Sequence, residues 1–133
     1  MIRILLVEDD QNQRLLYQME LEDDGYEVVT ASEGQEALQM VQSGRPDLVI
    51  LDLALPGMDG IQVLQRIVHS PNTINPRVII YTAYDTSRNH FKTRSADAFM
   101  VKSSDFGRLK EKIRQMLDAP PDRTRVSGAE AAV

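Results

Sequence analysis

The chain has 133 residues and no cysteine, with 42% apolar and 26% charged residues and a formal net charge of −5 at pH 7. These values indicate one soluble globular domain, exclude a disulfide framework and a cysteine metal site, and argue against broad binding to nucleic acid or anionic membranes. No apolar run reaches the length of a membrane span and no signal-peptide layout is present, so a cytoplasmic protein is expected.

The first predicted strand ends on consecutive acids. Residues 2–7 are nearly all apolar and are followed by Glu8, Asp9 and Asp10. Asp10 with Gln13 is a capping-box pattern that predicts a helix after this strand. Glu8 and Asp9 have no such structural explanation, which leaves a solvated turn or a binding site as the alternatives. The inner face of the helix is predicted to consist of Leu15, Leu16 and Met19.

Further strands are predicted at residues 27–31, 48–52, 77–82 and 98–101. Residues 48–51 are continuously apolar and end on Asp52, as expected of a strand buried on both faces. Five strands that alternate with helices predict a parallel sheet covered on both sides. The doubly wound order 2-1-3-4-5 fits this count.

The remaining helices are predicted largely from their caps. Ser32 with Gln35 and Asp59 with Gln62 repeat the capping-box pattern. The last helix is expected to be capped by Ser104 or Asp105.

Two segments carry little apolar sequence. Residues 85–94 have only one large apolar side chain, Phe91, and predict a short or weak helix. The domain is expected to span residues 1–118. Residues 119–133 hold too little apolar surface to fold and are predicted to be a disordered tail.

The predicted strand order brings polar residues to one crevice. Strands 1 and 3 are neighbours, so Glu8 and Asp9 are expected beside Asp52, while strands 4 and 5 deliver Thr82 and Lys102 to the same edge. Three clustered carboxylates repel one another, and Mg²⁺ with its preference for oxygen ligands relieves that repulsion. An ammonium and a hydroxyl beside one carboxylate make a site for a phosphoryl group carried on Asp52.

At this point the chain resembles the receiver domains of two-component response regulators, the CheY-like family. The resemblance covers roughly residues 2–117 and implies a flavodoxin-like (βα)5 domain that signals rather than an enzyme, although it assists its own phosphorylation and dephosphorylation. The motifs that carry it are Leu6-Val7-Glu8-Asp9-Asp10, Leu51-Asp52 with Pro56-Gly57-Met58-Asp59-Gly60, Tyr81-Thr82-Ala83 and Phe99-Met100-Val101-Lys102.

The resemblance implies a phosphoacceptor and its metal ligands. Asp52 would accept a phosphoryl group from a histidine kinase. Mg²⁺ would be held by Asp9, Asp52 and the carbonyl of Ala54, and by Glu8 mostly through water. Two residues at the mouth of the crevice are expected to tune the lifetime of the phosphorylated form: the ring of Tyr84 excludes water and slows loss of the phosphate, whereas the small Ala54 on the other side offers no shield.

The same resemblance implies a switch. Thr82, Ala83 and Lys102 would contact the phosphoryl oxygens, and Phe99 would move inward as Thr82 turns toward the phosphate. Expected partners are a histidine kinase or phosphotransfer protein and a downstream output protein, without direct contact to nucleic acid or membrane. The face made by the fourth helix, fifth strand and fifth helix would carry the output, and the protein would be a monomer or a weak dimer through that face.

Two features depart from the family pattern. Ser103 stands where a proline usually follows the lysine, and a cis bond there would be costly. The segment from Thr82 to Lys102 is about two residues shorter than expected, and its usual Ala-Gly-Ala-Asp turn is reduced to Ser95-Ala96-Asp97. Both departures touch the signalling side of the domain.

Two other functions compete with a phosphorylated receiver. A haloacid-dehalogenase-like phosphatase also uses an aspartate nucleophile and Mg²⁺, but it carries a second acid two residues later, where this chain has Ala54. A receiver-like interaction module that never takes phosphate is the other alternative, and the intact acids argue against it. A nucleotide-binding domain is less favoured still, because no glycine-rich loop follows the first strand.

Overall fold

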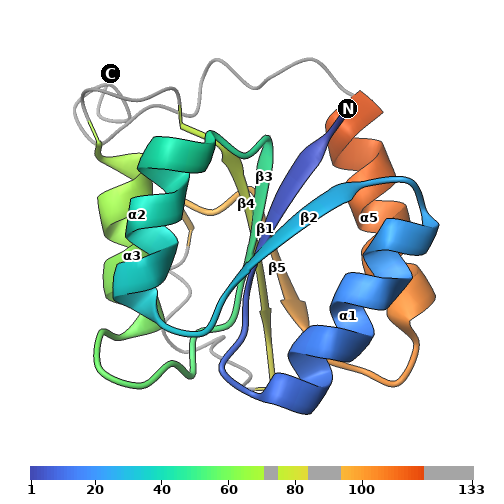
Figure 1. Cartoon of the computed structure of the whole chain (residues 1–133), viewed down its shortest axis with the longest axis horizontal. Coiled ribbons are helices and arrows are strands. Elements are labelled where there is room, and N and C mark those ends of the chain that lie inside the picture. The colour runs from blue at the N-terminus through green and yellow to red at the C-terminus, as the bar shows by residue number, and fades with distance from the viewer. Residues whose placement is uncertain (71–74, 84–93, 119–133) are drawn as a thin grey trace.

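A five-stranded parallel sheet forms the centre of the molecule. The computed structural model describes residues 1–70, 75–83 and 94–118. The strands follow the order β2-β1-β3-β4-β5, with every neighbouring pair parallel, as predicted (Figure 1). Their bounds are β1 Arg3–Val7, β2 Glu27–Ala31, β3 Leu48–Leu51, β4 Arg77–Thr82 and β5 Ala98–Val101.

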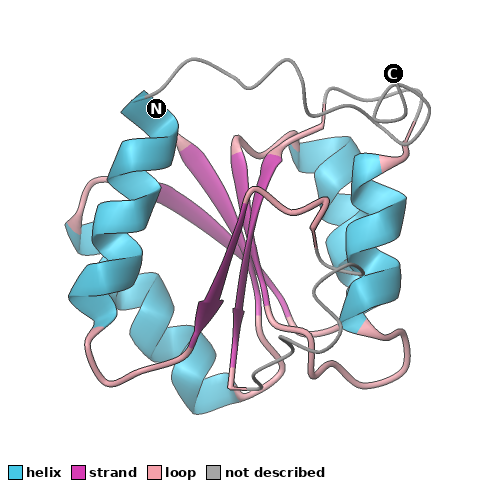
Figure 2. Cartoon of the chain, turned by 180° about the vertical axis from the view of Figure 1, so that it is seen from behind, coloured by secondary structure: helices cyan, strands magenta, loops and turns pink. Residues whose placement is uncertain are grey.

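Helices cover both faces of this sheet. Helices α1 (Gln11–Asp23) and α5 (Phe106–Asp118) lie on one side, and α2 (Gly34–Gly44) and α3 (Gly60–Val68) on the other (Figures 1 and 2). The weak helix predicted at 85–94 and the predicted tail at 119–133 fall almost entirely outside the described residues. Within the described part of the chain, no helix is long and apolar enough to cross a membrane.

Each strand of the sheet contributes to two hydrophobic cores. In β1, Leu5 and Val7 face α2 and α3, whereas Ile4 and Leu6 face α1 and α5, and all four are at most 2% exposed. Burial on both faces explains the unbroken apolar runs Ile4–Val7 in β1 and Leu48–Leu51 in β3. Full burial of such a side chain contributes about 1.5–3 kcal/mol to the free energy of folding. The sheet therefore holds the residues at its edge in fixed positions.

Helix α1 is correctly predicted in position but not in orientation. Leu15, Leu16 and Met19 are 50%, 54% and 63% exposed, so the predicted inner face is wrong. The buried stripe instead contains Leu21, with the half-buried Tyr17 one turn earlier. Apolar side chains occur on both sides of this helix, and helical spacing alone selected the more apolar side rather than the side that packs.

The helix caps divide into confirmed and wrong predictions. The carboxylate of Asp10 accepts from the backbone N–H of Gln13 at 2.9 Å, and Asp105 accepts from Gly107 N–H at 3.0 Å. Helix α3 has the complete capping box. Ser32 is not the cap of α2, because the helix starts later and Glu33 occupies the cap position. The side chain of Glu36 instead reaches back to accept from Ser32 N–H at 2.7 Å.

Candidate functional site

The carboxyl ends of four strands meet at one edge of the sheet. The register pairs Val7 with Leu51, Leu51 with Ile80, and Thr82 with Val101. The residues that follow, or end, these strands therefore lie side by side at the lower edge in Figure 1. Ligands of open parallel sheets bind at this edge, beside the point where the strand order reverses.

Asp52 lies at the centre of this edge and is only 5% exposed. Its Oδ1 accepts from the Thr82 hydroxyl at 2.9 Å and from the Ala54 backbone N–H at 3.0 Å. Its Oδ2 accepts from Lys102 Nζ at 2.8 Å. The backbone N–H of Asp52 also donates to the Val7 carbonyl at 3.1 Å, which fixes the residue against β1. Both carboxylate oxygens are thus held by donors from separate parts of the chain.

Lys102 is a cation shared among three acceptors. Its Nζ lies 2.6 Å from Glu8 Oε1, 2.7 Å from Gln13 Oε1 and 2.8 Å from Asp52 Oδ2. Burial alone would lower the pKa of Lys102, but its hydrogen bonds to Asp52 and Glu8 outweigh that effect and raise the pKa. The ammonium therefore stays charged and neutralises part of the acidic cluster. The Lys102–Ser103 bond belongs to a described segment without cis peptides.

Three carboxylates at this edge could hold a metal ion. Oxygen atoms from Glu8, Asp9 and Asp52 all lie within 4.8 Å of one another. Glu8 is 2% exposed, and its burial raises the pKa of that carboxyl although Lys102 partly offsets the effect. Asp9 is exposed, which gives a cation access from solvent. All-oxygen ligands beside open solvent fit a hard ion such as Mg²⁺, which keeps several waters.

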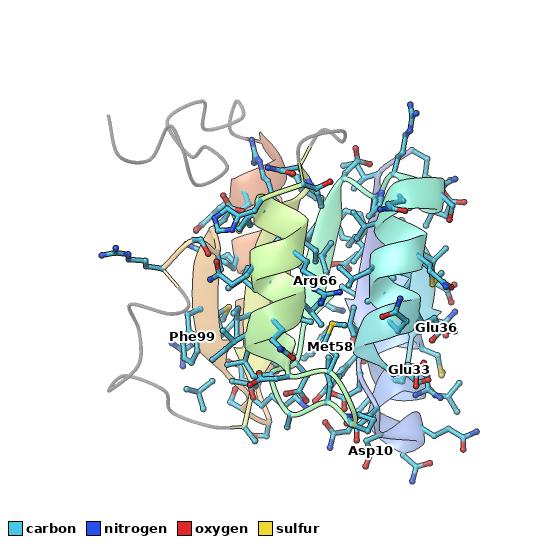
Figure 3. All side chains as sticks on the ribbon, turned by 90° about the vertical axis from the view of Figure 1, so that its left-hand side faces the viewer. Asp10, Glu33, Glu36, Met58, Arg66 and Phe99 are labelled. Atoms are coloured by element: carbon cyan, nitrogen blue, oxygen red, sulfur yellow. The ribbon has the colours of Figure 1, made fainter. Side chains whose placement is uncertain are left out.

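The loop after Asp52 shapes the side of the crevice. Gly57 has φ +73°, a conformation that favours glycine. A Cβ at Gly60 would lie 2.8 Å from the Asp52 carbonyl oxygen, so only glycine fits there. Met58 is partly buried and packs against the core between α2 and α3 (Figure 3). The turn formers in this loop therefore set the position of Asp52 as well as the start of α3.

Of the other predicted residues, Phe99 lies on the core side of β5, Ala83 directly follows Thr82, and Tyr84 is outside the described residues. Phe99 is half-buried on β5 and packs against the core on the α2 and α3 side (Figure 3). A cavity of about 270 Å³ between β5 and α5 is lined in part by Phe99, Tyr81 and Arg108. Ala83 is exposed directly after Thr82. Tyr84 belongs to the part of the chain that the structure does not describe.

Sequence reasoning missed two site residues on α1. Gln13 accepts from Lys102, and the guanidinium of Arg14 donates to the carbonyl oxygens of Glu8 and Asp9 at 2.9 and 3.3 Å. In the sequence, Gln13 was explained as part of the capping box that begins helix α1. Arg14 belonged to no recognised motif. Only the position of α1 at the end of β1 brings both side chains back to the acids.

Comparisons with known proteins agree on one family. A model of the response regulator receiver domain matches residues 4–114. Sporulation initiation phosphotransferase F of Bacillus subtilis is 44% identical over 82 residues, which are 62% of this chain and 64% of that protein. Response regulator ArlR of Staphylococcus saprophyticus is 33% identical over 127 residues, which are 95% of this chain and 57% of ArlR. The chain thus spans less than two thirds of these relatives' length.

Solved structures give the same result. Response regulator TrrA of Thermotoga maritima, in complex with Mg²⁺-BeF, matches with a TM-score of 0.80 and 42% identity over 86% of this chain and 98% of that chain. A structure of the histidine kinase ThkA in complex with TrrA matches with a TM-score of 0.78 at 42% identity, covering 86% of this chain and 97% of that chain.

Proposed function

The chain belongs to the response regulator receiver domain family, and from this premise we propose that Asp52 accepts a phosphoryl group from a histidine kinase or a phosphotransfer protein in a Mg²⁺-dependent reaction. The observation that carries the proposal is the set of donors on Asp52. An ammonium, a hydroxyl and a backbone amide contact its two oxygens at 2.8 to 3.0 Å. A carboxylate in that setting can attack phosphorus while its neighbours receive the phosphoryl oxygens.

The reaction needs little beyond positioning and neutralisation of charge. A carboxylate oxygen of Asp52 attacks the phosphorus of a phosphohistidine, the phosphorus–nitrogen bond breaks, and the imidazole nitrogen keeps the electron pair. Lys102 and Thr82, which hold Asp52 at rest, donate to the phosphoryl oxygens of the product. The backbone N–H of Ala83, an exposed residue, is a further donor in this proposal. The product is an acyl phosphate, which water can hydrolyse. The domain is proposed to assist this later hydrolysis as well.

Glu8, Asp9 and Asp52 are the side chains proposed to hold Mg²⁺, together with the carbonyl of Ala54. The support is that the three carboxylates lie within 4.8 Å of one another. The ion would supply neutralisation of charge on the transferring phosphoryl group. The rival haloacid-dehalogenase-like phosphatase is disfavoured because the position of its second acid is Ala54, whose backbone N–H holds Asp52.

The exposed side of α1 is the proposed docking surface for the phosphodonor protein. Leu15, Leu16 and Met19 form an apolar patch on the helix that begins directly after the acids. Large exposed apolar patches commonly mark interaction sites. Helix α1 begins directly after Glu8, Asp9 and Asp10, so a partner seated on it would lie near the acidic cluster. TrrA, which matches this chain, has been observed in complex with the kinase ThkA.

Output is proposed to pass through the face that includes β5 and α5 and the segment between β4 and β5. Thr82 and Phe99 would form the switch, and Phe99 also lines the cavity between β5 and α5 on this face. A downstream protein, or a second copy bound weakly, would bind this face.

Ala54 and Tyr84 remain the residues predicted to tune the lifetime of the phosphorylated form. The boundaries 1–118 and 119–133, and a cytoplasmic location, also stay predictions.

Phosphorylation of the purified chain tests the proposal. Incubation with a small-molecule phosphodonor and Mg²⁺ should add one phosphoryl group to the wild-type protein, measured by intact mass. Asp52→Asn should remain unmodified, and a chelator should abolish labelling of the wild type. Labelling of Asp52→Asn to the wild-type extent would show that Asp52 is not the acceptor. Labelled kinases can then be screened as donors.

A further inference from the structure

Gln13 makes a contact that its helix-capping pattern does not require. Its side chain lies 2.7 Å from Lys102 Nζ. Because an ammonium only donates, the Gln13 atom facing it must be the amide oxygen. The same oxygen accepts from the Tyr17 hydroxyl at 3.3 Å. Gln13 therefore presents a neutral acceptor, held by two donors, at the third N–H of the lysine.

Helix α3 provides an internal comparison for this residue. Both α1 and α3 begin with the pattern Asp-x-x-Gln, at Asp10 and Asp59. In α3 the side chain of Gln62 returns to accept from Asp59 N–H at 3.3 Å, which completes the capping box. In α1 the corresponding N–H of Asp10 donates to Glu8 instead, and Gln13 turns to Lys102. The glutamine of α1 is thus diverted from a capping bond that its counterpart forms.

An aromatic cluster supports the diverted side chain. The ring of Tyr17 stacks on Phe106 of α5 with centroids 5.1 Å apart and meets Tyr81 edge to face at 5.7 Å. Lys102 Nζ lies 5.8 Å from the centroid of the Tyr17 ring. These contacts join α1, β4 and α5 around the lysine. They fix the Tyr17 hydroxyl, which in turn fixes the amide of Gln13.

We propose that Gln13 is a positioning residue for Lys102, whose side-chain oxygen holds one N–H of the ammonium so that the other two stay directed at Glu8 and Asp52. The two ion-pair partners of Lys102 belong to the acidic cluster, whereas Gln13 carries no charge that would compete with them. Without it, the ammonium is free to rotate and shift between the acids. The effect of Gln13 on phosphoryl acceptance rests on the function proposed for Asp52 and operates only through Lys102.

A double-mutant cycle in metal-free protein tests the placement of Gln13 directly. Gln13→Met removes the acceptor at similar length, and Lys102→Met removes the cation. The folding equilibrium constant should fall about tenfold for Gln13→Met in the wild-type background, the effect of one hydrogen bond to a charged group. It should change little in the Lys102→Met background, because the partner is gone. Equal effects in both backgrounds would overturn the proposal.

Phosphorylation by a small-molecule donor at saturating Mg²⁺ gives the functional result. Gln13→Met should react about tenfold more slowly than wild type, while Gln18→Met, the same change at a position of α1 whose amide donates to Glu22, should react at the wild-type rate. Equal rates for Gln13→Met and wild type would overturn the proposal. If the wild type accepts no phosphoryl group, the function proposed for Asp52 fails, and Gln13 is judged by the unfolding cycle.

A spectroscopic measurement covers the case in which Lys102→Met does not fold. The side-chain ammonium resonance of Lys102, followed by nitrogen NMR, should be sharp in the wild type because all three N–H groups have acceptors. Gln13→Met should shift or broaden that resonance, whereas Gln18→Met should leave it in place. An unchanged resonance in Gln13→Met would show that Gln13 does not hold the lysine.

Discussion

The charge balance at the site depends on single residues, above all on Lys102. Its side chain is 13% exposed and lies between Glu8 and Asp52, whose side chains are 3% and 7% exposed. Removing one partner of a buried ion pair leaves charge without compensation, which costs more than the intact pair contributes. Because the pKa of Lys102 is raised, its contribution is present below the ordinary lysine pKa and is lost as the pH rises through the raised value.

Lys102→Met should lower the free energy of unfolding by about 3 kcal/mol at neutral pH. The loss should shrink as the pH falls through the carboxyl range. Burial raises the pKa of Glu8, so its folded form takes up a proton early and then needs no counter-charge. Urea unfolding in a chelating buffer measures both effects. Lys110→Met, which removes a surface partner of Glu20, is the matched control and should show a small loss. A pH-independent loss for Lys102→Met would contradict this account.

Gly60 has no Cβ, and this allows the backbone of Asp52 and Leu53 to lie close to it. An added Cβ would approach the Asp52 carbonyl oxygen to 2.8 Å, and the atoms it meets are backbone, which cannot easily move. Gly60→Ala should therefore destabilise the fold by about 1–3 kcal/mol through overpacking. Gly44→Ala is the control, because no atom lies within 4 Å of an added Cβ there. Equal unfolding midpoints for the two variants would contradict the steric explanation.

At the scale of elements, helix α1 marks where sequence patterns stop being sufficient. Its start was predictable from Asp10, whose carboxylate caps the helix as expected. Its orientation was not, because Leu15, Leu16 and Met19 keep helical spacing as well as the buried stripe does. The choice between the two sides is made by packing against the sheet and α5, where Tyr17 stacks on Phe106. Such tertiary contacts cannot be predicted from the residues of the helix alone.

The exposed side of α1 leads to a prediction about partners. The double variant Leu16→Gln/Met19→Gln should leave the free energy of unfolding within about 0.5 kcal/mol of wild type, as for other exposed positions. Phosphotransfer from a cognate histidine kinase should slow at least tenfold, while phosphorylation by a small-molecule donor should keep the wild-type rate. Leu21→Ala, on the buried side, should instead lose about 2–5 kcal/mol of stability. Equal slowing with both donors would refute a docking role for the patch.

At the scale of the whole molecule, strand order creates the site. Glu8, Asp52, Thr82 and Lys102 come from four strand ends that are as many as 94 residues apart in sequence, the separation of Glu8 and Lys102. The alternation of strands and helices, with the family resemblance, was sufficient to predict that they meet. The sharing of Lys102 among Glu8, Asp52 and Gln13 could not be predicted, because it depends on side-chain directions at the ends of three separate elements.

The measurement that tests the central claim most directly is the chemical identification of the phosphorylated residue. Treatment of the phosphorylated protein with borohydride reduces an aspartyl phosphate to homoserine, which peptide mass spectrometry locates. Homoserine is expected at position 52 alone, with Glu8, Asp9 and Asp59 unchanged, and none is expected in protein kept from Mg²⁺. Homoserine at another acid, or a stable phosphate on a hydroxyl such as Thr82 with position 52 unmodified, would contradict it.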